Sequence, residues 1–147
     1  NVYVADRENA RVQVFDPEGR YKSQWRSRVA SLTPSRQAFQ RHVSSISYNA
    51  QLDAFVVVEG AGFHLRTRSG CEILSIQNAF NWPHDAILLP SAAAASSAIV
   101  ENAARRGNGT AMSISGREYR VFVAELDGRR VQSYTTGGQN AAASLYG

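Results

Sequence analysis

A histidine and an aspartate stand side by side in the stretch NWPHDAILLP, Asn81 to Pro90, immediately before a strongly apolar run. The imidazole of His84 could bind a metal ion, or it could be an ordinary hydrogen-bonded surface side chain. The carboxylate of Asp85 could hold a cation, or it could cap a loop. On these residues alone, the cluster fits either a loop or the mouth of a site.

Arg7 stands in the sequence ADREN, between two acids. A planar guanidinium that never loses its proton suits a carboxylate ligand, because it can donate two parallel hydrogen bonds. The ordinary alternative is a turn arginine that pairs with Asp6 or Glu8. The single cysteine, Cys71, excludes an internal disulfide and a cysteine-based zinc cluster in this chain.

Bulk composition describes one globular domain. The chain has 147 residues, 44% of them hydrophobic and 19% charged, which is enough for a core and too short to favour two domains. No run of about 18 apolar residues occurs, so we expect no membrane segment. The first residues lack a secretion signal, and we expect the chain to begin inside a domain. Because the arginines behind the net charge of +4 are scattered, we expect no nucleic-acid partner.

The elements that must position these residues come from an internal repeat. Each copy opens with a β-branched and aromatic run that ends at an acid, continues through a short turn into an alternating strand, and reaches a glycine turn. The three acids are Asp6, Glu59 and Glu125. The repeated segments are VYVADRENARVQVFDPEGRYKSQW, FVVVEGAGFHLRTRSGCEILSI and VFVAELDGRRVQSYTTGG.

This pattern predicts short antiparallel strands, four in a complete unit, that recur at about 50 residues, which is the arithmetic of a β-propeller. The first unit lacks its opening strand. The expected strands are Arg11–Phe15, Tyr21–Trp25, Val43–Tyr48, Phe63–Thr67, Glu72–Ile76, Asp85–Pro90 and Arg130–Tyr134, and the expected units span about 1–26, 42–78 and 83–136. A β-sandwich is the alternative fold.

Two segments depart from the repeat. Residues 91–116 are rich in Ala, Ser and Gly and show no amphipathic period, so we expect a loosely packed insertion between two strands of one unit. The tail at 137–147 has the same composition, and we expect it to be flexible.

Several of these motifs together resemble one known family. VYVADRENARVQVFDPEG has the form of an NHL repeat, and ADREN, ISY, SGCEIL, PHD and VFVAELDGRRVQSY follow one another as in peptidyl-α-hydroxyglycine α-amidating lyase. The resemblance covers nearly the whole chain apart from the insertion and the tail. It implies an all-β fold in which this chain supplies the later blades, about three, of a six-bladed propeller.

The resemblance also implies site residues and cofactors. The family binds a catalytic zinc ion with three histidines from different blades, which points to His84 as one ligand, and a structural calcium ion, which points to Asp85. The arginine of ADREN lines the active site, which points to Arg7 as a catalytic and substrate-binding residue. Trp82 stands where the family commonly has methionine and would form part of the substrate pocket. The other zinc histidines and the catalytic tyrosine belong to earlier blades.

Other residues fit structural roles better. His64 lies in an outer-type strand, and His42 stands where the family pattern does not require histidine, so we do not assign them to a zinc site within this chain. Well-known family members carry a cysteine pair where this chain has Tyr3 and Val14, so we expect packing to hold those strands together instead.

The sequence therefore predicts the C-terminal part of a zinc-dependent lyase that cleaves peptidyl-α-hydroxyglycine to an amidated peptide and glyoxylate. The resemblance implies a peptide substrate, missing N-terminal blades of the same propeller as partners, and a secretory or extracellular location. We expect no activity from the chain alone, because one histidine cannot hold catalytic zinc. The alternative is a non-catalytic NHL propeller that binds protein or RNA.

Overall fold

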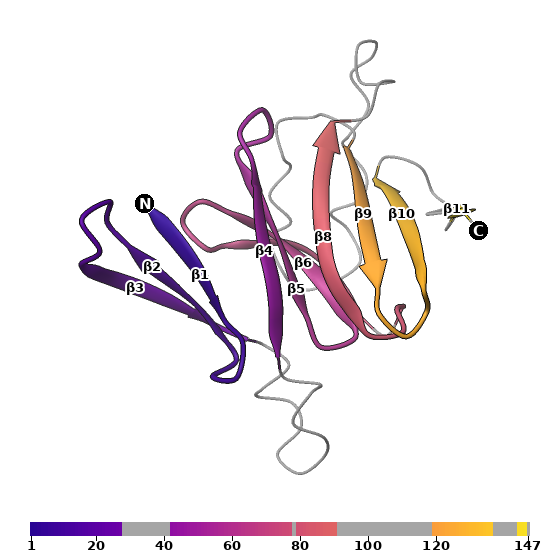
Figure 1. Cartoon of the computed structure of the whole chain (residues 1–147). Helices are drawn as coiled ribbons and strands as arrows, with labels where there is room; N and C mark the ends of the chain where they lie inside the picture. Colours follow the sequence, from indigo (N-terminus) through magenta and orange to yellow (C-terminus); the bar gives the residue numbers. More distant parts are fainter. Residues whose placement is uncertain (28–41, 78, 91–118, 137–143, 147) are drawn as a thin grey trace, which may run out of the picture.

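The computed structural model describes residues 1–27, 42–77, 79–90, 119–136 and 144–146 (Figure 1). The described residues form strands joined by turns, with no helix among them, and the strands make three antiparallel sheets. No described segment is a helix of the length and apolarity needed to cross a membrane. Three stacked sheets differ from the two sheets of a sandwich and are compatible with part of a propeller.

The strands follow the sequence in hairpin order within each sheet. Sheet 1 consists of β1 (Val2–Asp6), β2 (Arg11–Phe15) and β3 (Tyr21–Arg26). Sheet 2 consists of β4 (Val43–Asn49), β5 (Ala54–Glu59), β6 (Gly62–Thr67) and β7 (Glu72–Ile76). Sheet 3 consists of β8 (Pro83–Pro90), β9 (Tyr119–Glu125), β10 (Arg130–Thr136) and β11 (Ser144–Tyr146).

Each strand expected from the alternating pattern is present, with ends that differ by at most two residues. The largest differences are at β8, which begins at Pro83 rather than Asp85, and at β10, which ends at Thr136 rather than Tyr134. The tail contains β11, a strand that the sequence did not predict; it pairs with β10 and gives sheet 3 a fourth strand, as in sheet 2. The predicted insertion at 91–116 lies outside the described residues.

The sheets stack face to face, with sheet 2 in the middle (Figure 1). The strands β4 and β8, which open sheets 2 and 3, lie side by side, and β1 contacts β4 on its other side. We call the end of the stack where β1 ends and β4 and β8 begin the site edge; it lies at the bottom of Figure 1.

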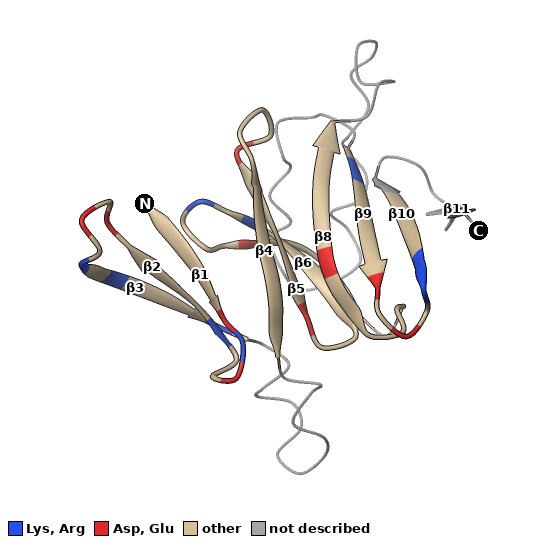
Figure 2. Ribbon diagram, viewed as in Figure 1, with Lys and Arg blue, Asp and Glu red and all other residues tan. Residues whose placement is uncertain are grey.

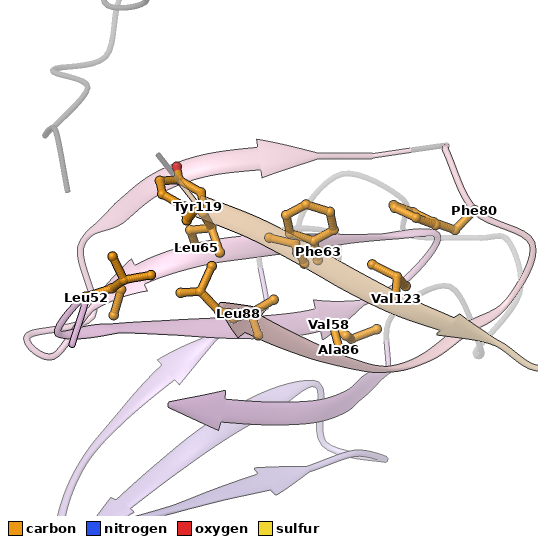
Figure 3. Packing of buried hydrophobic residues seen from close by; sticks show 12 residues of the cluster. Leu52, Val58, Phe63, Leu65, Phe80, Ala86, Leu88, Tyr119 and Val123 are labelled. Atoms are coloured by element: carbon orange, nitrogen blue, oxygen red, sulfur yellow. The ribbon is translucent and has the colours of Figure 1, made fainter. Parts of the chain in front are cut away.

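The larger core fills the space between sheets 2 and 3 (Figure 3). Alternate residues of β5, Val56 and Val58, face this core, as do Phe63 and Leu65 of β6. Leu88, Val121 and Val123 meet them from sheet 3. The side chains are almost completely buried, so this interface contributes most of the hydrophobic stabilisation.

A second, aromatic core joins sheets 1 and 2. The other residues of β5, Phe55 and Val57, face it, which explains why every residue of β5 is buried. The ring of Tyr3 lies 4.4 Å from that of Phe55 and 5.4 Å from that of Trp25, centroid to centroid. Tyr3 pairs with Val14 in the register of β1 and β2, and the Tyr3 side chain packs against this core.

The three sheets repeat the same facing rule. The residues two and four positions before each acid point toward the preceding sheet: Phe55 and Val57 toward sheet 1, and the equivalent valines of β9 toward sheet 2. In β1 the equivalent residues are Val2 and Val4, which are 49% and 41% exposed, against 3% and 2% for Phe55 and Val57. Sheet 1 therefore presents an apolar face that has no neighbouring sheet within the described residues.

The opposite end of the stack is also apolar. Ile87 and Leu89 of β8 and Val131 of β10 are exposed on sheet 3. Exposed β-branched and leucine side chains on a sheet face are typical of a surface that another sheet covers. Both outer sheets thus carry the pattern of interior sheets.

The acid at the end of the second strand in a full sheet is buried and joins that sheet to the segment before it. We call Asp6, Glu59 and Glu125 the junction acids. The carboxylate of Glu125 accepts hydrogen bonds from the backbone N–H of Asn81 at 3.0 Å, from Arg130 Nε at 3.3 Å and from the Gln132 amide. The side chain of Glu125 is fully buried, and the contact with Asn81 fixes the segment that leads into β8.

Glu59 is the junction acid of sheet 2, and its partner is His64. The imidazole Nε2 contacts the Glu59 carboxylate, and Nδ1 lies 3.1 Å from Glu72 Oε2. Both Glu59 and His64 are buried. Burial raises the pKa of Glu59, but hydrogen bonding and charge attraction from His64, with smaller effects of Ser27 and Arg66, outweigh burial and hold the pKa below its ordinary value of 4.5.

We expect His64→Ala to lower the free energy of unfolding at pH 7 by about 3 kcal/mol, because it leaves the Glu59 carboxylate buried without its partner. Urea unfolding monitored by fluorescence measures the change. Glu18→Gln, at an exposed acid in the turn between β2 and β3, is the control and should change stability by less than about 0.5 kcal/mol. An equal effect of both substitutions would contradict a structural role for His64.

The Glu59–His64 pair should make the free energy of unfolding depend on pH. Because the pKa of folded Glu59 is lowered, its contribution to stability is fully present above pH 4.5 and is lost as the pH falls through the lowered pKa. In His64→Ala, burial acts on Glu59 against only the smaller effects of Ser27 and Arg66 and raises its pKa, so acid no longer destabilises the protein through this group. Urea unfolding between pH 7 and pH 3 should show the two proteins converging in stability. A difference in the free energy of unfolding that stays constant with pH would contradict the coupling of Glu59 to His64.

Candidate functional site

Arg7 is presented by a turn whose geometry Asp6 fixes. The Asp6 carboxylate accepts hydrogen bonds from Arg11 Nε at 2.7 Å and Asn9 Nδ2 at 2.8 Å, which tie both sides of the β1–β2 turn together. The hydrogen bond from Arg11 contributes most to lowering the pKa of Asp6, and the hydrogen bond from Asn9 contributes next. Ala10 adopts a left-handed φ of 51° and donates its N–H to the Arg7 carbonyl at 3.1 Å. Arg7 is therefore held at the site edge rather than on a strand face.

The turn around Arg7 concentrates charge, as Figure 2 shows by the acidic and basic residues gathered where β1 meets β2. Arg7 Nε lies 3.9 Å from Glu8 Oε1, and His42 Nε2 lies 3.3 Å from Glu8 Oε2. The Nε atom of Arg7 is buried but has no hydrogen-bond partner among the described residues. The guanidinium of Arg7 is thus only weakly engaged and can donate to a ligand.

His84 and Asp85 lie at a β-bulge where β8 begins. Pro83 pairs with Glu125 and Asp85 pairs with Ala124, so His84 is an extra residue without a partner in β9. Regular strand alternation would place His84 and Asp85 on opposite sides of the sheet, but the bulge removes the basis for that expectation. Both side chains are exposed.

The side chains of His84 and Asp85 differ in how free they are to bind a ligand. The imidazole of His84 makes no hydrogen bond or ion pair with the other described residues. Asp85 Oδ1 accepts a hydrogen bond from the N–H of Ala86 at 2.8 Å. A free imidazole and a carboxylate with an oxygen to spare both fit the donor types that zinc and calcium prefer.

Trp82 immediately precedes the bulge and adopts a left-handed φ of 56°. Its carbonyl accepts a hydrogen bond from Leu126 N at 2.9 Å. Its side chain is partly exposed, and it stands two residues before His84 in the sequence. A partly exposed indole at the site edge is consistent in position with a pocket wall.

The structure brings these residues to one edge without joining them into one cluster. Arg7 follows the end of β1 and His84 follows the first residue of β8, so both lie at the site edge, one on each side of β4 (Figure 1). Within the described ranges, no group of three or more His, Cys, Asp or Glu side chains could hold a metal ion. A metal ion at His84 would need further ligands from outside the described residues.

Sequence reasoning did not single out His42 as a contact of the Arg7 turn. The signal for it is positional: His42 stands one residue before β4 as Trp82 stands one residue before β8. His64, by contrast, is buried inside sheet 2 between Glu59 and Glu72, far from free solvent.

Comparison of the chain with protein-family models, with characterised proteins and with solved structures gave no match.

The environments of the three histidines predict an order of chemical reactivity. We expect diethyl pyrocarbonate to modify exposed His84 first, His42 more slowly and buried His64 only on unfolding. Mass spectrometry of peptides from protein treated for increasing times measures each rate. Modification of native His64 as fast as His84 would contradict the burial of the Glu59–His64 pair.

Proposed function

We propose that the chain is the C-terminal part of a propeller-type, zinc-dependent lyase that converts peptidyl-α-hydroxyglycine to a peptide amide and glyoxylate. The observation that carries the proposal is the common location of Arg7 and His84 at the site edge, although they belong to sheets 1 and 3. A carboxylate-binding group and a metal-ligating imidazole at the same edge match the two functional groups of this substrate.

The exposed apolar faces support a larger assembly. Val2 and Val4 on sheet 1 and Ile87 and Leu89 on sheet 3 lie on faces whose equivalents in the stack are covered by a neighbouring sheet. Further sheets of the same kind would cover both faces, and they would bring the remaining zinc ligands and the catalytic tyrosine. We infer the missing N-terminal blades as the source of these sheets.

The residues of this chain would divide the chemistry as follows. Arg7 donates paired hydrogen bonds to the substrate carboxylate and so orients the α-carbon. His84 contributes one neutral imidazole ligand. When bound, zinc would lower the pKa of the coordinated hydroxyl or water by several units. Loss of the α-hydroxyl proton makes that oxygen the aldehyde oxygen of glyoxylate, the C–N bond breaks with its electrons moving to nitrogen, and the amide nitrogen takes up a proton.

Two further roles belong to the same proposal. The exposed indole of Trp82 forms part of the pocket wall that receives the peptide side of the substrate. The free oxygen of Asp85 binds a structural calcium ion, which would strengthen the bulge at the start of β8. Peptide amidation would place the protein in the secretory pathway.

Cleavage of benzoyl-α-hydroxyglycine to benzamide and glyoxylate by the full-length protein tests the function. We expect His84→Ala to lower zinc content and to reduce the rate at least about a hundredfold, because a catalytic zinc site has three protein ligands. Glu18→Gln, at an exposed acid in the turn between β2 and β3, should leave both unchanged. Unchanged zinc content and rate in His84→Ala would remove His84 from the site.

Substitution of Arg7 tests carboxylate binding separately. We expect Arg7→Ala to raise KM about tenfold or more, since hydrogen bonds to charged groups contribute about 1.5–3 kcal/mol. Arg20→Ala is the matched control, because Arg20 pairs with Asp16 in the exposed β2–β3 turn. Turnover by the 147-residue chain alone would contradict the prediction that its site is incomplete. Absence of zinc and of cleavage in the full-length protein would favour a non-catalytic NHL propeller.

A further inference from the structure

His42 occupies the position in sheet 2 that Trp82 occupies in sheet 3. Each residue stands directly before the first strand of its sheet. Each carbonyl also accepts a hydrogen bond from the residue after the junction acid: His42 O from Gly60 N at 3.1 Å, and Trp82 O from Leu126 N at 2.9 Å. The backbone therefore delivers His42 to the site edge, between Arg7 and His84.

One carboxylate connects His42 to Arg7. Glu8 places Oε2 3.3 Å from His42 Nε2 and Oε1 3.9 Å from Arg7 Nε. Glu8 is 76% exposed, whereas the side chain of His42 is only 14% exposed. The imidazole is thus a nearly buried group on sheet 2 that faces the turn of sheet 1.

Two buried polar atoms at this point have no hydrogen-bond partner among the described residues: Arg7 Nε and His42 Nδ1. Buried polar atoms normally have a hydrogen-bond partner, so an unpaired one indicates a ligand, an ion or a water molecule that supplies it. That both atoms belong to the same three-residue contact makes a shared ligand the economical explanation.

The chemistry of the two atoms defines this ligand. A neutral imidazole that faces the Glu8 carboxylate through Nε2 carries its proton there, which leaves Nδ1 as a hydrogen-bond acceptor. Arg7 Nε can only donate. The matching ligand therefore has an acceptor, such as a carboxylate, beside a donor, such as a hydroxyl. A 2-hydroxycarboxylate carries both groups on adjacent carbons.

We infer that His42 is a second substrate-positioning residue, which accepts a hydrogen bond from the α-hydroxyl through Nδ1 while Arg7 binds the carboxylate. This inference rests on the proposed function and names a contact within the same site. It gives His42 a role in affinity, because the hydrogen bond holds the hydroxyl-bearing carbon in one orientation.

Binding of mandelate, a 2-hydroxycarboxylate without a C–N bond to cleave, tests the inference apart from catalysis. Calorimetry on the full-length protein compares mandelate with phenylacetate, which lacks the hydroxyl. We expect mandelate to bind about tenfold more tightly to the wild-type protein, the effect of one good hydrogen bond. His42→Ala should abolish this preference.

Two conservative variants separate the ring nitrogens. Asparagine places an acceptor at the position of Nδ1, and glutamine places a donor at the position of Nε2. We expect His42→Asn to keep the hydroxyl preference and His42→Gln to lose it, with similar thermal unfolding temperatures for both. The reverse result, or an unchanged preference in His42→Ala, would overturn the inference. Glu18→Gln, at an exposed acid in the β2–β3 turn, is the control and should keep the hydroxyl preference.

Cleavage assays on the same proteins distinguish this inference from the proposed function. A raised KM for benzoyl-α-hydroxyglycine in His42→Gln with nearly unchanged kcat supports positioning. Cleavage by the wild-type protein with an unaltered KM in His42→Ala overturns the inference and leaves the proposed function standing. A His42-dependent mandelate preference without cleavage rejects the lyase and retains the binding site.

Discussion

The junction acids are the constraint on which the arrangement of the described sheets depends. Glu125 is fully buried, yet its carboxylate accepts the backbone N–H of Asn81 from the segment that leads into β8. A buried carboxylate without such partners would cost several kcal/mol, so the sheet and the preceding segment must form together. The same position in sheet 2 holds Glu59, which pairs with His64, and in sheet 1 it holds Asp6, which orders the turn that presents Arg7.

Much of this fold could be predicted from the sequence because its signals are local. Alternating side chains and glycine turns located the strands, and the recurrence of an acid at Asp6, Glu59 and Glu125 aligned them correctly. Strand alternation depends only on the chain itself. The stacking of sheets was implied by β5, whose residues Ala54 to Glu59 are apolar up to the final acid and therefore need covering on both faces.

The local geometry of the site edge was not predictable in the same way. A β-bulge depends on the register between two strands, so the sequence PHD could not reveal that His84 is the extra residue opposite β9. The equivalent irregularity between Val43 and Ser45 in β4 shows that the bulge belongs to the repeat. The contact between Glu8 and His42 was hidden for a related reason, since it joins two sheets and is separated by 34 positions (42 minus 8) in the chain.

The start of β8 is strained, and its surroundings hold it in place. Trp82 has a left-handed φ of 56°, which costs a non-glycine residue about 1 kcal/mol or more. Hydrogen bonds on both sides of the strained residue oppose this cost: Asn81 N to Glu125 Oε2, and Leu126 N to the Trp82 carbonyl. Because the same clamp precedes the bulge, the backbone on either side of His84 has little freedom. An exposed imidazole on a fixed backbone is pre-organised for a ligand, which a histidine on a free loop would not be.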